Sequence, residues 1–216
     1  MKLSRFAELS IEEVANTATH GLGLLLSICG FIFLTLIAWR GDRWQWISSL
    51  VYGISLVVLY AASTLYHSTT SPHHKRLFQL LDHCCIFLLI AGSYTPFLLV
   101  LLRDGIGIGM LWIVWAIAIS GILLKVIFRE RANALGIVMY LALGWLGVFA
   151  VKPIYYAAGL IPMILIIAGG VSYSAGMIFF GWKSIRHHHA IFHVFVLIGS
   201  IIHYAAITFY IMPEWS

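Results

Sequence analysis

Apolar residues dominate this chain in long runs that charged residues interrupt only at intervals. Cutting the sequence at every Lys, Arg, Asp and Glu leaves seven charge-free stretches of 20 or more residues, at 14–39, 44–74, 83–102, 105–124, 132–151, 153–182 and 187–213. A helix needs roughly 20 mainly apolar residues to cross the hydrocarbon core of a bilayer. A soluble core helix has no reason to repeat that length so often, so the pattern predicts a membrane protein.

Helices are favoured over strands because the stretches lack the alternating pattern and regular turns of a barrel. The composition agrees, with 62% hydrophobic and 10% charged residues. We predict an all-α membrane protein, a seven-transmembrane helix bundle forming a single domain at 18–212 behind a cytoplasmic lead at 1–17. The spans are expected at about 18–39, 45–67, 78–102, 106–127, 133–152, 159–182 and 188–212.

The lead contains Ser10 and Glu13 at the spacing of a capping box, so it could begin an amphipathic helix. We expect this helix to lie at the membrane interface.

The orientation follows from the basic residues, because Lys and Arg accumulate in cytoplasmic loops. One set of alternate loops holds 9 of them and the other 4. The N-terminus is therefore predicted inside and the C-terminus outside, and this bias explains the net charge of +5 without nucleic-acid binding. The larger set is Lys2, Arg5, Lys75, Arg76, Lys125, Arg129, Arg131, Lys183 and Arg186, and the smaller is Arg40, Arg43, Arg103 and Lys152.

Four ionisable residues stand at the ends of predicted spans: His67, Asp82, His189 and His193. Such residues are costly within a membrane and are usually kept for function. The predicted topology places all four near the cytoplasmic leaflet. His189 and His193 are four residues apart, which puts both imidazoles on one face of a helix.

Three histidines with an open fourth position are the ligands of a catalytic zinc site. Asp82 could orient a water at that position or accept its proton. Ser63 precedes His67 by four residues, so its hydroxyl faces the same side of the helix and could reach a ligand, a water or a substrate oxygen.

The residues alone leave simpler interpretations open. Interfacial histidines are often ordinary amphipathic residues, and Ser63 could serve helix packing by bonding to its own backbone. His187 and His188 are expected to be solvated. His203 lies ten residues beyond His193, about 15 Å deeper by helical rise, and is expected outside the ligand set.

Three motifs resemble those of the hemolysin III family, the bacterial branch of the progestin and adipoQ receptor family. They are Ala-Ser-Thr-Leu-Tyr-His at 62–67, Leu-Asp-His-Cys at 81–84 and His-Ala-Ile-Phe-His at 189–193. Two further segments support the resemblance, Ala-Asn-Thr-Ala-Thr-His-Gly at 15–21 and Ala-Gly-Ser-Tyr-Thr-Pro-Phe at 91–97. The similarity covers nearly the whole chain.

The resemblance implies seven spans, a cytoplasmic N-terminus and Zn²⁺ bound by His67, His189 and His193, as in adiponectin receptors. It also implies that Asp82 contacts the zinc-bound water and that Ser63 belongs to the site. Alkaline ceramidases, in the wider superfamily, hydrolyse a lipid amide at a similar zinc site. The long N-terminal domain of the animal receptors has no counterpart here, which argues against a hormone-receptor role.

The expected function is zinc-dependent hydrolysis of a lipid amide or ester in membrane lipid homeostasis, with Asp82 as the general base. The alternatives are a non-enzymatic sensor of the membrane state with a structural zinc, and a pore-forming hemolysin. The resemblance further implies a multi-pass protein of the bacterial cytoplasmic (inner) membrane whose partners are membrane lipids. The sequence determines neither the lipid nor the oligomeric state.

Overall fold

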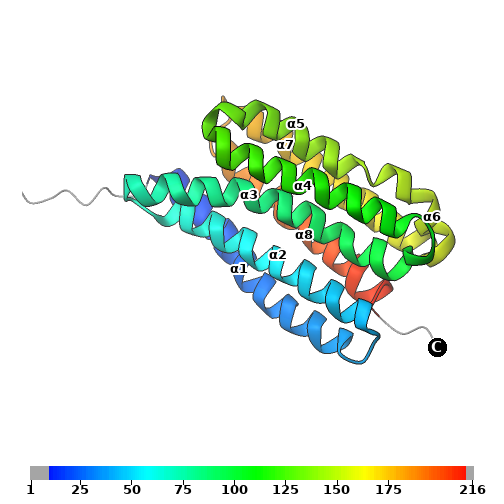
Figure 1. Cartoon of the computed structure of the whole chain (residues 1–216). Coiled ribbons are helices and arrows are strands. Elements are labelled where there is room, and N and C mark those ends of the chain that lie inside the picture. The colour runs from blue at the N-terminus through cyan, green and yellow to red at the C-terminus, as the bar shows by residue number, and fades with distance from the viewer. Residues whose placement is uncertain (1–9, 213–216) are drawn as a thin grey trace, which may run out of the picture.

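The computed structural model describes residues 10–212, and every regular element in that range is a helix (Figure 1). The all-α class is therefore confirmed. Two π-helical segments, Phe97–Leu101 and Arg103–Gly107, join α3 to α4, and a 3-10 turn at Arg129–Ala132 joins α4 to α5. The α-helices are α1 (Ile11–Ala38), α2 (Arg43–Ser68), α3 (Pro72–Pro96), α4 (Ile108–Phe128), α5 (Asn133–Trp145), α6 (Val148–Ala158), α7 (Leu160–Gly181) and α8 (His188–Tyr210).

The first two helices form an antiparallel hairpin with a short connection (Figure 1). Asp42 begins α2 with a complete capping box, in which its side chain accepts from the Gln45 N–H and the Gln45 side chain accepts from the Asp42 N–H. Gly53 of α2 faces the Phe31 ring of α1, where a Cβ atom would collide with the ring. The small residue lets the two helices approach closely, as is common between helices in membranes.

The helical run from Arg103 to Ala158 is 56 residues long, but it folds back on itself. Arg129 follows α4 with φ at 47° and ψ at −122°, and Figure 1 shows α5 returning beside α4. The Tyr140 hydroxyl of α5 donates to the His83 carbonyl of α3 at 2.8 Å. The Tyr94 hydroxyl, farther along α3, donates to the Gly144 carbonyl at 2.6 Å. Thus α5 runs in the direction of α3 and against α4.

A break separates α5 from α6 inside the span that we expected at 133–152. The Tyr94 hydroxyl accepts a hydrogen bond from the Gly147 N–H at 2.6 Å while it donates to Gly144. Because backbone groups within a membrane need partners, this side chain satisfies two groups that the interrupted helix leaves free.

By length and hydropathy, the described residues contain six helical runs able to cross a membrane, and the folded-back run counts as one of them. Their outward faces are apolar, with Trp112 74% and Phe149 70% exposed. A helix that is apolar all round is typical of a membrane span. This is a helical membrane protein, and its buried core includes Tyr52, Tyr60, Phe87, Leu98 and Leu143.

The largest difference from the predicted spans is at the start of the chain. The α1 helix begins at Ile11 rather than at residue 18, so the end of the predicted lead is continuous with the first span. Residues 1–9, which include Lys2 and Arg5, lie outside the described residues.

Candidate metal centre

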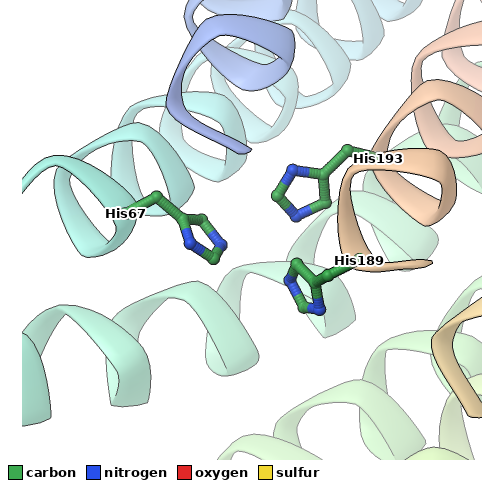
Figure 2. Close-up of side chains that lie close together, drawn as sticks. All are labelled: His67, His189 and His193. Carbon is green, nitrogen blue, oxygen red and sulfur yellow. The ribbon is translucent and has the colours of Figure 1, made fainter. Parts of the chain in front are cut away.

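Three histidines from two helices meet at one end of the bundle. The ligand atoms of His67, His189 and His193 all lie within 4.8 Å of one another. Their rings point toward a common space in Figure 2, with ring centroids 4.6 to 5.1 Å apart. His67 and His193 are buried, and His189 is partly buried.

The ends of two helices place these side chains. His67 is in the last turn of α2, and α8 begins at His188 after His187, which adopts the left-handed conformation at φ 59°. His189 and His193 therefore occupy the first two turns of α8, one above the other on one face. Two ligands on one helix and one on another form a tripod, as predicted from the spacing.

The hydrogen bonds of His67 leave one ring nitrogen free for a ligand. Its Nδ1 lies 2.6 Å from the Glu13 Oε2 atom. A neutral imidazole that donates through Nδ1 presents a lone pair at Nε2. The His67 Nε2 atom is buried and has no hydrogen-bond partner among residues 10–212.

This arrangement fits a metal ion. A histidine that binds a metal usually donates its other N–H to a carboxylate, which fixes the ring and raises its basicity. The Glu13–His67 pair has this form, and a cation at Nε2 would satisfy an otherwise orphaned buried atom. The donor set is nitrogen-rich, which suits Zn²⁺, although imidazole also suits other transition metals.

Glu13 was not identified from the sequence as part of the site. Ser10 caps α1 by accepting from the Glu13 N–H at 3.2 Å, as the capping-box spacing predicted. The Glu13 carboxylate instead binds His67 and, through Oε1, the Lys75 Nζ atom at 2.6 Å. The polar start of α1 thus contributes to the candidate metal centre, whereas we had expected it only to lie at the interface.

His20 is a second residue that the sequence analysis did not assign. Its ring stacks on His193, with centroids 3.5 Å apart and planes 19° from parallel. Its Nδ1 atom lies 2.6 Å from the Ser63 Oγ atom. Glu13 and His20 are seven residues apart, with Asn16 between them beside His67, so one face of α1 supplies all three. The spacing of Glu13, Asn16 and His20 along one helix face is the feature of the sequence that could have identified them.

The two predicted non-ligand residues lie near the tripod without joining it. Ser63 is fully buried, and its Oγ atom lies 2.6 Å from the His20 Nδ1 atom. Asp82 is not among the residues whose ligand atoms cluster. The structure therefore brings the three histidines together, and Asp82 is not part of that cluster; a catalytic role for either residue stays a prediction.

The other histidines on α8 face different surroundings. His203 Nε2 lies 3.0 Å from the Ile166 carbonyl oxygen of α7, away from the cluster. His188 Nε2 lies 3.9 Å from a Glu12 oxygen. Neither belongs to the three-histidine cluster.

Comparison with known proteins agrees with the motifs. A family model described as "Haemolysin-III related" matches residues 10–204. The chain is 44% identical over 200 residues to the "Hemolysin-3 homolog" of Bacillus subtilis (strain 168), covering 92% of this chain and 94% of that protein. It is 42% identical over 216 residues to "Hemolysin-3" of Bacillus cereus, covering 100% and 99%.

A more distant relative is the "Monocyte to macrophage differentiation factor" of Homo sapiens, 28% identical over 213 residues, covering 96% of this chain and 87% of that protein. The family match spans all three histidines and the residues of α1 that surround them. The resemblance inferred from the motifs is confirmed: this chain belongs to the haemolysin-III-related family.

Proposed function

We propose that this is a seven-pass protein of the bacterial cytoplasmic membrane with its N-terminus inside. The reversal at Arg129 supports the count, because it divides the 56-residue run into two passes in opposite directions. The excess of Lys and Arg in alternate loops supports the orientation. The tripod then lies near the cytoplasmic face.

We further propose that His67, His189 and His193 hold a Zn²⁺ ion. The observation that carries this proposal is the pairing of the Glu13 carboxylate with His67 Nδ1 beside a partnerless, buried Nε2. Without a cation, three imidazole rings would lie with centroids within 5.1 Å of one another while the buried His67 Nε2 atom has no hydrogen bond to offset its burial. A bound ion removes that cost.

The activity that this centre supports best is hydrolysis of a lipid amide or ester. Zn²⁺ in such a site polarises a carbonyl oxygen and lowers the pKa of water to about 7. Asp82 would act as the general base that accepts a proton from water and returns it to the leaving group. Ser63 would support the site through its hydroxyl, which contacts the His20 ring at 2.6 Å.

The ring of His20 would complete this chain of polar groups. It lies between Ser63, which its Nδ1 contacts at 2.6 Å, and His193, on which it stacks. His20 would thereby fix the orientation of both neighbours. Membrane lipids are the proposed partners, because a centre near the cytoplasmic face, as the proposed orientation has it, would lie where an acyl amide or ester meets the interface.

Metal content is the first measurement. Protein purified in detergent should carry about one zinc per chain by mass spectrometry, and a His189→Ala, His193→Ala double variant should carry almost none. The matched control is His73→Gln with His74→Gln, because these histidines are exposed at the start of α3 and do not belong to the cluster. Intact protein without metal, or a double variant that keeps it, would refute the site.

A turnover assay separates a catalytic centre from a structural one. Ceramide-like amides and ester lipids are offered to intact protein and to Asp82→Asn. We expect Asp82→Asn to keep its zinc and lose about 10²- to 10⁴-fold in turnover, the usual contribution of a general base. Zinc without turnover of any lipid would favour the alternative, in which the metal ties α2 to α8 in a membrane sensor.

A further inference from the structure

A cavity of about 420 Å³ opens where α3, α4 and α5 meet, on the other side of α3 from the histidine cluster. This volume falls within the range of small-molecule sites. Four basic residues line it, Arg76, Lys125, Arg129 and Arg131, against one acidic residue, Glu130. We call this the basic cavity.

Within residues 10–212, the four cations of the basic cavity have no carboxylate partner within 4.0 Å. Among residues 10–212, the ion pairs within 4.0 Å involve Glu12, Glu13, Asp42 and Asp104, and none of these pairs includes a residue of the cavity. The lining therefore carries a formal charge of +3, four basic residues less one acidic residue. Basic residues without carboxylate partners around one cavity favour an anionic ligand.

Lys125 gives the clearest sign of a built site. The residue is only 2% exposed, and its Nζ atom donates to the Asn133 Oδ1 atom at 2.8 Å. An ammonium group has three N–H donors, and a neutral amide satisfies one of them without balancing the charge. Burying an unpaired charge is costly, so an anion in the cavity would stabilise this lysine.

Gly136 makes room for the head of that lysine. A Cβ atom at this position of α5 would lie 2.6 Å from Lys125 Cε and 3.0 Å from its Nζ. The close approach brings the ammonium beside the α5 backbone at the edge of the cavity. The glycine at 136 therefore makes room for the charged head of Lys125 and not for an apolar side chain.

The turn that closes the cavity is strained. Arg129 adopts φ 47° and ψ −122°, and with His187 it is one of two non-glycine residues at positive φ among the described residues. Such a conformation costs free energy and is found mainly where function requires it. Here it directs the chain around the cavity and places Arg129 and Arg131 on its wall.

The preference of cytoplasmic loops for Lys and Arg would account for basic residues at this end of the bundle. It does not require them to surround one cavity, nor a lysine to be buried there. Lys183 and Arg186, which belong to the same predicted side, are exposed and do not line the cavity.

We propose that the basic cavity binds the phosphate group of an anionic phospholipid. Lys and Arg are the usual partners of phosphate oxygens, and basic pockets between membrane helices receive lipid headgroups. Leu80, Ile127 and Phe128 also line the cavity, and the last two are exposed, so apolar surface continues from the charges toward the bilayer. That continuity favours a lipid over free phosphate. The inference does not depend on hydrolysis at the metal centre.

The test is a calorimetric titration of the full chain in detergent. The probes are dihexanoyl phosphatidylglycerol, dihexanoyl phosphatidylcholine and inorganic phosphate. We expect saturable binding of the phosphatidylglycerol at about one per chain, weakened at least about tenfold in a Lys125→Met, Arg129→Gln variant because two charged contacts are lost. A Lys183→Met, Arg186→Gln variant removes the same charge from the same side and should bind as the intact chain does.

The outcomes separate the sources of the phosphate. Weak binding of inorganic phosphate and phosphatidylcholine supports an anionic lipid, whereas equal binding of phosphate and lipid supports the oxyanion site and assigns its ligand to the aqueous phase. Binding that is unchanged in the cavity variant, or reduced equally in the control, would overturn the proposal. Arg129→Gln with Arg131→Gln, both exposed, replaces the first variant if removing the buried Lys125 prevents folding.

Discussion

Two polar regions lie on either side of α3, and they are built on opposite principles. At the histidine cluster, three imidazole rings surround a space that suits a cation, and the Glu13 carboxylate binds one of them from the other side. At the basic cavity, four cations surround a space that suits an anion. Both regions bury polar groups that the protein itself leaves incompletely satisfied, the His67 Nε2 atom in one and the Lys125 ammonium in the other.

The difference shows how a mostly apolar bundle can hold two ligands of opposite charge. Gln79 lies at the boundary: it lines the basic cavity, and its Nε2 donates to the Tyr66 hydroxyl at 3.1 Å. Tyr66 in turn packs beside His67, with ring centroids 4.5 Å apart. Lys75 lies over the Tyr66 ring at 4.8 Å while its Nζ binds Glu13. The two regions are therefore neighbours, and each can be perturbed with the other as a control.

Among the variants that distinguish the two regions, the largest effect is expected from Glu13→Gln. Loss of the carboxylate that orients His67 should lower metal affinity about 10- to 100-fold, the usual cost of removing such a partner. Zinc affinity is measured by competition with a chelator, and phospholipid binding at the basic cavity should be unchanged.

The control for that change is Glu12→Gln. Glu12 is the preceding residue, and its Oε1 atom lies 3.9 Å from His188 Nε2. The Glu12→Gln variant removes the same charge and leaves the contact between Glu13 and His67 in place. An equal loss of affinity in both variants would mean that net charge, and not the orientation of His67, governs the metal.

A smaller effect is expected from Gly136→Val. The added atoms would displace the Lys125 head, so phosphatidylglycerol binding should fall several-fold and the protein should lose about 1–3 kcal/mol, as overpacked positions do. Thermal unfolding and the lipid titration measure the two effects. Gly144→Val is the control, because nothing lies within 4 Å of its added Cβ atom. Undiminished lipid binding in Gly136→Val would show that this glycine does not contribute to binding at the cavity.

The smallest effect is expected from Gln79→Leu, which removes the hydrogen bond between the two regions. We expect a loss of about 0.5–1.5 kcal/mol in stability, typical of one hydrogen bond, with zinc and lipid affinities each changed by less than a few-fold. Titrating lipid with and without zinc gives the coupling between the sites. A large change in that coupling would show that Gln79 transmits one occupancy to the other site.

The sequence alone predicted the helical membrane class and the three-histidine cluster. The class follows from local patterns, because long apolar runs make spans, and four-residue spacing puts His189 and His193 on one helix face. His67 was joined to that pair by the predicted topology and by the family resemblance. The reversal after Phe128 also had a signal, since Arg129, Glu130 and Arg131 interrupt the apolar run there. We recognised no signal in the sequence for the break between α5 and α6, because the hydrogen bonds at that break come from Tyr94 on another helix.

The tertiary structure decided which distant residues meet. Glu13 and His67 are 54 residues apart, and His20 and His193 are 173 apart, so no spacing along the chain reveals their contacts. The basic cavity likewise needs α3, α4 and α5 to be packed before its four cations converge. The sequence by itself determined which residues share a helix face, because that depends on local geometry. Only packing decided which faces meet, because it depends on how all the helices bury their small and polar residues together.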